Sequence, residues 1–182
     1  MKKIMMIAAM MLLSVGAFAQ AGKFAVGANA GIALYGDDYN PFGVGAKLQY
    51  EFVESFRAEL AYNYWFPKDK AGVMDIDLNF QYLIPVSEGI NVYPLVGVNL
   101  AMTHGDAWKV ANDGQESIFG FQGGFGIEYY IAENVKINLD AKYQYNKKTK
   151  SYSYTSGNVT VAGETEMKFD GPVIQAGIAY VF

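Results

Sequence analysis

The amino-acid sequence predicts an all-β protein whose chain closes into one antiparallel, up-and-down barrel of eight strands. Three observations support this fold class. Apolar and polar residues alternate with a period of two over eight long segments, the connections between segments alternate in length, and aromatic residues gather near the segment ends. Successive side chains of a strand point to opposite faces, so this alternation is typical of strands with one apolar and one polar side.

The first four expected strands each divide into an apolar and a polar face. Residues 24–34 alternate Phe, Val, Ala, Ile and Leu with Gly and Asn, and residues 42–52 alternate Phe, Val, Ala, Leu and Tyr with Gly, Lys, Gln and Glu. Residues 56–66 oppose Phe, Ala, Leu and Tyr to Arg, Glu and Asn, with Trp65 as the exception on the polar side. Residues 74–82 oppose Met, Ile, Leu, Phe and Tyr to Asp, Asn and Gln.

The other four expected strands cover residues 92–102, 117–131, 135–145 and 168–182. The first two carry glycines on the polar side, which would relieve crowding in a narrow interior. Residues 135–145 show the division most clearly, because the odd positions are apolar or aromatic while the even positions are polar. A tilted membrane-spanning strand needs about 9–11 residues and a soluble strand averages about five or six, so these lengths favour membrane-spanning strands.

The first nineteen residues are expected to be removed before the chain folds. Two lysines precede an apolar run over residues 4–13, and Ala17-Phe18-Ala19 has the small-x-small pattern of a cleavage site. This is the layout of a secretory signal peptide, and the run is shorter than the roughly 18–20 residues of a membrane-spanning helix. We therefore expect a signal peptide over residues 1–19 and a single barrel domain over residues 20–182.

The composition of the mature part narrows the class of protein. Removal of the two signal-peptide lysines changes the formal net charge from −4 to −6, which makes nucleic acid an unsuitable partner. The chain has no cysteine, so its fold does without disulfides. Fourteen tyrosines, twelve phenylalanines and twenty glycines, without a further helix-length apolar run, favour a barrel.

The connections between the expected strands are alternately short and long. Short turns are expected near residues 53–55, 85–89 and 132–134, and longer loops near residues 36–41, 67–72, 103–116 and 148–167. Bacterial outer-membrane barrels have short periplasmic turns and longer external loops. With an even number of strands, both chain ends would then lie in the periplasm.

Aromatic residues on the apolar face gather at two levels. The level near the short turns and chain ends contains Phe24, Tyr50, Phe52, Phe56, Tyr82, Tyr129, Tyr180 and Phe182, and the level near the long loops contains Phe42, Tyr64, Phe66, Phe119, Phe121, Tyr143 and Tyr145. Two aromatic girdles around an aliphatic band are typical of a barrel in a bilayer. A soluble barrel of the lipocalin kind would turn its apolar face inward. We therefore expect the apolar face to contact outer-membrane lipid.

The polar face carries ten charged residues that we expect to point into the barrel. They are Lys47, Glu51, Arg57, Glu59, Asp75, Asp77, Glu128, Lys136, Asp140 and Lys142. With Lys23 they comprise five basic and six acidic residues, which can largely neutralise one another. An eight-stranded barrel is just wide enough for side chains to fill it, so we interpret these residues as an ionic plug. A narrow path for ions or small solutes is the alternative.

Two short stretches add a family resemblance. Phe125-Gly126-Ile127-Glu128-Tyr129-Tyr130 leads into a short turn and an amphipathic strand, and the chain ends on Ala179-Tyr180-Val181-Phe182. With the strand pattern over residues 23–182, they resemble the small outer-membrane barrels of the OmpA/OmpX type. The resemblance implies that Ile178, Tyr180 and Phe182 form the signal read by the barrel-assembly machinery, and it implies no peptidoglycan-binding domain. Ala19 followed by Gln20 is similar to the export signals of Bacteroidetes.

Candidate catalytic and metal-binding residues are few. Some eight-stranded barrels modify lipid A, and such chemistry commonly needs a nucleophile with a histidine and a carboxylate. The one histidine, His104, is near in sequence only to Thr103, Asp106 and Ser117. Asp75-x-Asp77 would suit a hard cation, but we expect both residues to belong to the interior ion network. The sequence therefore predicts no catalytic residue, no metal site and no cofactor.

The last long loop is the strongest candidate for external contacts. Lys147, Lys148 and Lys150 precede a stretch rich in Tyr, Ser and Thr whose alternation continues past the membrane level, which predicts a hairpin turning near residues 156–158. The edge of this hairpin would suit an external protein partner that adds a strand to it. Its lysines would suit the phosphates of lipopolysaccharide. The third interpretation is a solvated loop without a partner. We expect a non-enzymatic outer-membrane barrel that serves envelope integrity, adhesion or partner contact. A narrow porin-like channel is the alternative, and a lipid A-modifying enzyme comes third.

Overall fold

The structure, a computed structural model, describes residues 22–36, 40–68, 71–104, 116–156 and 159–182. The predicted signal peptide lies outside these residues. The described strands are β1 (Lys23–Ala33), β2 (Phe42–Val53), β3 (Phe56–Lys68), β4 (Ala71–Tyr82), β5 (Ile84–Ser87), β6 (Ile90–His104), β7 (Ser117–Ala132), β8 (Val135–Ser156), β9 (Val159–Lys168) and β10 (Gly171–Val181). This part of the chain contains no helix that is long and apolar enough to cross a membrane.

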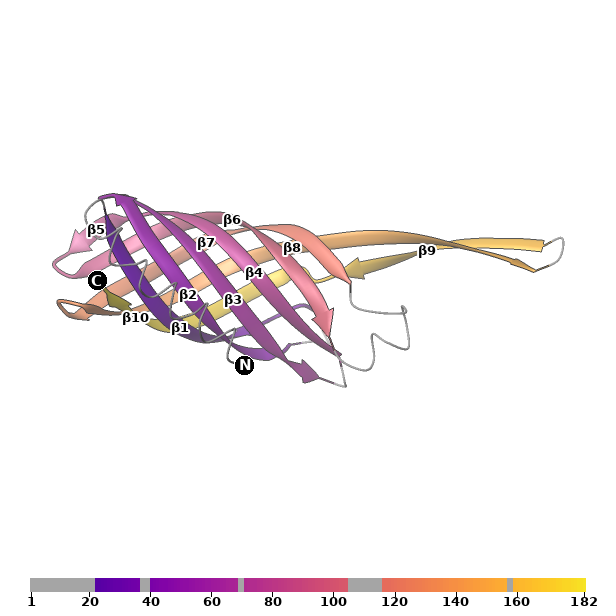
Figure 1. Cartoon of the computed structure of the whole chain (residues 1–182), viewed down its shortest axis with the longest axis horizontal. Coiled ribbons are helices and arrows are strands. Elements are labelled where there is room, and N and C mark those ends of the chain that lie inside the picture. The colour runs from indigo at the N-terminus through magenta and orange to yellow at the C-terminus, as the bar shows by residue number, and fades with distance from the viewer. Residues whose placement is uncertain (1–21, 37–39, 69–70, 105–115, 157–158) are drawn as a thin grey trace, which may run out of the picture.

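Eight of these strands close into one antiparallel barrel. The order is β1-β2-β3-β4-β6-β7-β8, and β10 closes the wall by pairing with β1 on one side and β8 on the other. Figure 1 shows the strands running at a steep tilt around the wall. Among the described strands, β5 pairs only with β6, and β9 pairs only with β8. The predicted fold class, an eight-stranded antiparallel barrel, is confirmed.

The short connections and the end of β10 lie at one end of the barrel, the turn end. β2 joins β3 across residues 54–55, and β7 joins β8 across residues 133–134. The Phe182 amide donates a 2.8 Å hydrogen bond to the carbonyl oxygen of Phe24, so the last residue lies beside the start of β1. The opposite end, the loop end, is where β1, β3 and β6 finish and where β8 leaves the barrel wall.

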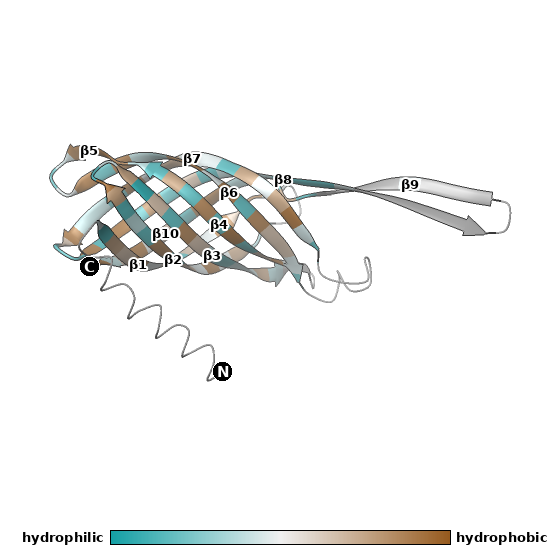
Figure 2. Ribbon diagram, turned by 45° about the horizontal axis from the view of Figure 1, so that its top comes forward, coloured by the Kyte–Doolittle hydropathy of each residue, from teal (hydrophilic) through white to brown (hydrophobic). Residues whose placement is uncertain are grey.

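Apolar side chains cover the outside of the barrel wall. Brown and teal segments alternate along the strands of the barrel wall in Figure 2, as a side-chain period of two requires. Large apolar side chains stand out from the wall, among them Phe125, which is 71% exposed, and Phe121, which is 62% exposed. Such a continuous apolar surface is foreign to soluble monomers and suits a lipid environment.

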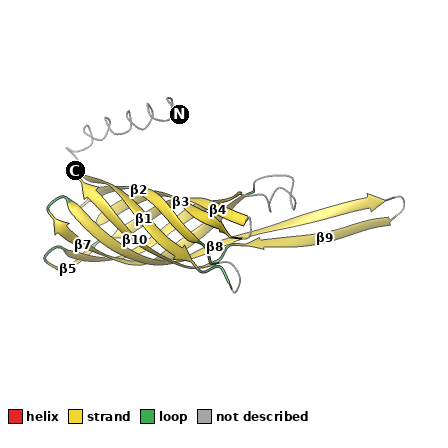
Figure 3. Ribbon diagram, turned by 90° about the horizontal axis from the view of Figure 1, so that it is seen from below, coloured by secondary structure: helices red, strands yellow, loops and turns green. Residues whose placement is uncertain are grey.

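The outer half of β8 and all of β9 form a hairpin that projects far beyond the loop end, as Figures 1 and 3 show. β8 has 22 residues, and its outer part pairs with β9 from Lys147↔Lys168 to Ser156↔Val159. The predicted strand over residues 135–145 is therefore too short. The predicted turn of the hairpin near residues 156–158 agrees with the end of β8 at Ser156 and the start of β9 at Val159. The same register continues to Gln144↔Gly171, so β9 and β10 are two parts of one long strand interrupted at residues 169–170.

Candidate functional site in the barrel interior

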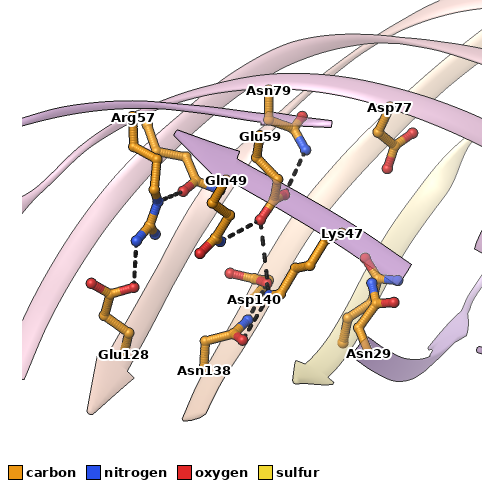
Figure 4. A network of polar contacts seen from close by, with 12 residues as sticks. Asn29, Lys47, Gln49, Arg57, Glu59, Asp77, Asn79, Glu128, Asn138 and Asp140 are labelled. Atoms are coloured by element: carbon orange, nitrogen blue, oxygen red, sulfur yellow. Dashed lines mark hydrogen bonds and ion pairs between the residues drawn. The ribbon is translucent and has the colours of Figure 1, made fainter. Parts of the chain in front are cut away.

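Inward-facing side chains fill the barrel between its two ends. All ten charged residues that the sequence assigns to the polar face are buried here, none more than 8% exposed: Lys47, Glu51, Arg57, Glu59, Asp75, Asp77, Glu128, Lys136, Asp140 and Lys142. Alternation places them, because each barrel strand turns every second side chain inward. Figure 4 shows several of them meeting across the lumen from different strands.

Arg57 is the centre of the charge cluster nearest the turn end. Its Nη1 donates to Glu128 Oε2 over 2.6 Å, and its Nε donates to Gln81 Oε1 over 2.6 Å. Lys136 Nζ lies 3.1 Å from the same Glu128 oxygen, and Glu51 Oε1 lies 3.7 Å from Arg57 and 3.9 Å from Lys136. Two cations and two carboxylates thus balance, and such balance is what makes buried charges tolerable.

Lys47 occupies the middle of the interior. Its Nζ donates to Asn138 Oδ1 over 2.7 Å and lies 3.8 Å from Glu59 and 4.0 Å from Asp140. Glu59 Oε2 also accepts a 2.7 Å hydrogen bond from Gln49, as Figure 4 shows. One lysine therefore compensates two carboxylates, and neighbouring amides supply the remaining donors.

A third group lies towards the loop end. Lys142 Nζ forms an ion pair with Asp77 Oδ2. Asn63 Nδ2 donates to Asp75 Oδ1 over 2.6 Å and to Asp77 Oδ2 over 3.2 Å, and the indole Nε1 of Trp65 donates to Asp75 Oδ2 over 2.6 Å. Two carboxylates are therefore held together by one cation and three neutral hydrogen bonds.

Amide side chains link these charge clusters into one network. Gln122 donates to Asn79 over 2.5 Å and accepts from Gln144 over 3.0 Å, while Asn146 donates to Asn99 over 2.6 Å. The sequence interpretation considered the charged residues alone and overlooked the amides. Two of these amides, Gln144 and Asn146, could have been assigned to the interior from the sequence. They occupy even positions on β8, as the inward lysines of the same strand do.

An apolar layer, which the sequence analysis did not predict, closes the interior at the loop end. Its buried members are Ala33, Trp65, Val73, Ala101, Ile118, Phe169 and Val173. Tyr35 packs against this layer, with its ring 6.2 Å from that of Phe169, and donates its hydroxyl hydrogen to Gln144 Oε1. Trp65, the single exception noted in the sequence, is fully buried here.

Gly43 makes room for the Trp65 ring. A Cβ atom at residue 43 would lie less than 3 Å from three ring carbons of Trp65, a distance that real Cβ atoms do not reach. Gly43 and Trp65 are register partners on β2 and β3, so the indole lies flat over the glycine backbone. The small residue on one strand therefore permits the largest side chain of the layer on the next.

The sole histidine is not part of a catalytic arrangement within the described residues. The His104 ring stacks on Tyr64 with centroids 4.7 Å apart, and neither imidazole nitrogen has a hydrogen-bond partner there. Thr103 faces the interior, where its Oγ1 accepts from the Glu116 amide over 2.9 Å. Asp106 lies outside the described residues. Across those residues, no group of three or more potential metal ligands is close enough to hold an ion.

Residues 5–182 match the family model described as the outer membrane protein beta-barrel domain. The chain belongs to this family. It is thus a β-barrel protein of the outer membrane, as the sequence predicted. No curated protein matches its sequence.

Solved structures show the same fold for this outer-membrane barrel. OprG from Pseudomonas aeruginosa superposes with a TM-score of 0.63 at 18% identity, covering 89% of this chain and 96% of OprG. Escherichia coli Outer Membrane Protein W gives 0.57 at 18% identity, covering 89% and 98%. The N-terminal barrel domain of Pseudomonas aeruginosa OprF gives 0.56 at 13% identity, covering 88% and 99%. Identities this low establish the shared fold alone.

The outward aromatic residues form contacts at both ends of this outer-membrane barrel. At the turn end the Phe56 and Tyr82 rings are 4.9 Å apart, and at the loop end those of Phe42 and Phe66 are stacked 5.9 Å apart. Of the residues assigned to the two girdles, Phe24, Tyr50 and Tyr64 are half-buried and the others are exposed. Of the residues assigned to the assembly signal, Ile178 and Tyr180 lie on the outward face of β10, and Phe182, the residue after β10, is also exposed.

A charge placed on the apolar wall should destabilise the barrel. Leu78 lies outward on β4 between Leu60 and Val98, and Leu78→Arg is expected to lower the free energy of unfolding by about 2–4 kcal/mol in a bilayer. Urea titration of liposome-folded protein, read as the band that migrates apart from boiled protein on a gel, measures the loss. Leu78→Ala is the matched control, because it removes the side chain without adding charge. Equal losses for both variants would contradict a lipid-facing wall at this residue.

Proposed function

We propose that this outer-membrane barrel is a non-enzymatic protein with a plugged interior, and that its external hairpin and loops serve envelope integrity, adhesion or partner contact. The observation that carries the proposal is the filled interior. Paired charges occupy the lumen from Glu128 to Asp77, and the apolar layer around Trp65 covers their outer end. An ion crossing the barrel would have to separate several buried ion pairs and then pass apolar side chains.

The loop-end histidine supports a non-enzymatic role. A lipid-modifying hydrolase needs a nucleophile within hydrogen-bond reach of a base that a third group orients. In the described part of the chain, His104 stacks on Tyr64 and neither of its nitrogens has such a partner. The imidazole is therefore packed as an aromatic side chain at the outer rim of the wall.

The proposal includes three further partners. Outer-membrane lipid contacts the apolar wall, and the barrel-assembly machinery reads the exposed Ile178, Tyr180 and Phe182 during insertion. Lipopolysaccharide phosphates are suitable ligands for basic residues at the base of the hairpin, since clustered lysines attract anionic headgroups. Lys148 is placed there and already bonds to Glu116 Oε2 over 2.8 Å.

Planar-bilayer recordings test the plugged interior. Purified, folded protein is expected to give no discrete conductance steps, while a general porin reconstituted in parallel gives them. Regular steps that scale with the amount of folded protein would support the narrow channel instead.

Thiol labelling on intact cells tests the external hairpin. The chain has no cysteine, so Ser151→Cys on the hairpin and Glu133→Cys in a short turn are each unique labelling sites. A membrane-impermeant maleimide is expected to label Ser151→Cys on intact cells and Glu133→Cys only after the outer membrane is opened. The reverse pattern would place the hairpin in the periplasm and refute the proposed contact surface.

A further inference from the structure

The buried charges of the barrel interior do not balance. The ten inward charged residues comprise six carboxylates and four cations, which are Lys47, Arg57, Lys136 and Lys142. Lys23, the fifth basic residue of the polar face, is exposed and does not join them. The described interior therefore has two more negative than positive groups. A buried charge without a partner is costly, and it is neutralised by a proton or by a counter-ion.

The imbalance lies in the middle and outer parts of the interior. Near the turn end, the two cations around Glu128 balance its carboxylate and that of Glu51. Each group further out has one lysine for two carboxylates. Lys47 lies between its two, at 3.8 Å from Glu59 and 4.0 Å from Asp140, so both carboxylates share its charge. The group nearest the loop end is compensated less evenly.

Asp75 and Asp77 form a pair of neighbouring carboxyl groups on β4, here called the aspartate dyad. Both side chains point inward from the same strand, and both accept a hydrogen bond from the amide nitrogen of Asn63, at 2.6 Å and 3.2 Å. Lys142 forms an ion pair with Asp77. No described cation forms an ion pair with Asp75, whose other hydrogen bond comes from the neutral indole of Trp65. One lysine thus faces two carboxyl groups that lie close together.

The surroundings of the dyad supply no further positive charge. The inward side chains that β1, β6, β7 and β10 place near it are neutral amides: Asn29, Asn99, Gln122 and Gln175. β2, β3 and β8 contribute Lys47, Glu59 and Asp140, and this lysine is already shared by two carboxylates. Asp75 is 1% exposed and Asp77 is 0% exposed. Within the described interior, neither solvent contact nor another cation therefore compensates the second carboxylate.

One oxygen of the dyad has no hydrogen-bond partner. Asp77 Oδ2 accepts from Lys142 and from Asn63, whereas Asp77 Oδ1 is buried without a donor. An unpaired oxygen on a buried carboxylate is costly. A proton on this oxygen removes one negative charge and converts the lone acceptor into an O–H donor. The neighbouring Asp75 is a suitable acceptor, because each carboxylate oxygen has two lone pairs.

We propose that the aspartate dyad binds one proton at neutral pH, so that its two carboxyl groups carry a single negative charge opposite Lys142. This inference rests on the proposed function and deepens it, because it names a ligand of the plugged interior. Two carboxylates that share a site without solvent do not both ionise freely, and the proton then belongs to the pair. The proton is a structural part of the plug, as a bound counter-ion would be.

Infrared spectroscopy of the folded protein tests the proposal. A protonated carboxyl group has a carbonyl stretching band above the amide bands, and an ionised carboxylate lacks it. The protein is folded in a detergent without carbonyl groups, because lipid esters absorb in the same region. The spectrum at neutral pH is expected to contain the band, which should shift when the protein is refolded in D2O. Absence of the band from the folded protein would overturn the proposal.

Asp77→Asn identifies the pair that holds the proton. The amide keeps an oxygen for Lys142 and Asn63, and it supplies N–H groups at the position of the unpartnered Oδ1. One carboxylate then remains opposite one lysine, so the infrared band is expected to disappear. Glu133→Gln, in an exposed turn, is the matched control and should leave the band unchanged. A band that persists in Asp77→Asn would place the proton elsewhere and overturn the proposal.

Urea unfolding of the same variants gives a second readout. Asp77→Asn is expected to keep the unfolding midpoint of the wild type or to raise it, because the dyad already contains one neutral carboxyl group. Glu128→Gln is the comparison, since it removes a carboxylate from a balanced cluster and leaves Arg57 and Lys136 against Glu51 alone. Its midpoint is expected to fall. An equal fall for both variants would show that both dyad carboxylates are ionised, contrary to the proposal.

Two further results separate the proton from a metal ion and from the plug itself. Suppose that the band is absent, and that replacing metal ions by a bulky organic cation destabilises the wild type but not Asp77→Asn. A metal ion would then be the counter-charge, and the proposal would be overturned. Planar-bilayer recordings test the plug independently. A closed barrel without the band overturns the proton alone, whereas regular conductance steps also remove the plugged interior on which it rests.

Discussion

Replacing Arg57 by methionine is expected to lower the free energy of unfolding by about 3–5 kcal/mol, because the change leaves buried carboxylates without their main counter-charge. Arg57 is fully buried and donates hydrogen bonds to Glu128 and Gln81, both over 2.6 Å. Its guanidinium carbon also lies 4.9 Å from the centre of the Tyr93 ring. Methionine keeps much of the volume but none of the donors, so Glu51 and Glu128 would share Lys136 alone.

A double-mutant cycle in liposome-folded protein measures the effect. Arg57→Met with Glu128→Gln removes one charge of each sign, and Lys136 and Glu51 remain as a balanced pair 3.9 Å apart. The double variant is therefore expected to lose less stability than Arg57→Met alone, although two side chains are changed. Losses that simply add would show that Arg57 and Glu128 act independently, which contradicts an ion network in the lumen.

Replacing Trp65 by alanine is expected to cost about 3–5 kcal/mol, the range measured when a large aromatic side chain is removed from a packed interior. The change deletes the largest member of the apolar layer and leaves a cavity over Gly43, against which the Trp65 ring packs. It also removes the 2.6 Å hydrogen bond to Asp75, a carboxylate that is 1% exposed. Loss of packing and loss of a hydrogen bond to a buried charge thus act in the same direction.

The neighbouring residue supplies the control for Trp65. Phe66 lies on the opposite face of β3, is 45% exposed and contacts Phe42. Phe66→Ala is expected to cost less than half as much as Trp65→Ala in urea unfolding of the liposome-folded protein, because its ring has less packed surface to lose. Equal losses would mean that the interior at the loop end is no better packed than the outer wall.

The inward and outward faces could be predicted from the sequence because a barrel strand has one simple period. In β8, Lys136, Asp140 and Lys142 occupy even positions, which all lie on one face of the strand. Their inward orientation could therefore be predicted from position alone. The identity of their partners could not be predicted in this way. Arg57 and Glu128 are on β3 and β7, which share no backbone hydrogen bonds, and they meet only because the wall curves closed.

The apolar layer at the loop end escaped prediction for a related reason. Val73 precedes the segment expected for its strand, Phe169 lies between β9 and β10, and Trp65 looked like an isolated exception. Their shared height in the barrel depends on strand tilt and register, which no single segment contains. The length of β8 was predicted only in part. Alternation past residue 145 indicated a hairpin, but it did not show that a single unbroken strand runs from the barrel wall into that hairpin.

The pairing of β1 with β10 has a consequence for how the protein reaches its native state. Ala25 pairs with Val181, so the first and last strands of the barrel are neighbours, and the closing seam joins residues from opposite ends of the chain. Contacts so distant in sequence slow folding, because a long loop must be ordered before the seam forms. An open intermediate would expose two unpaired edges, which hydrocarbon penalises heavily. Insertion and closure are therefore expected to be late, coupled events that begin only after synthesis has released the final strand.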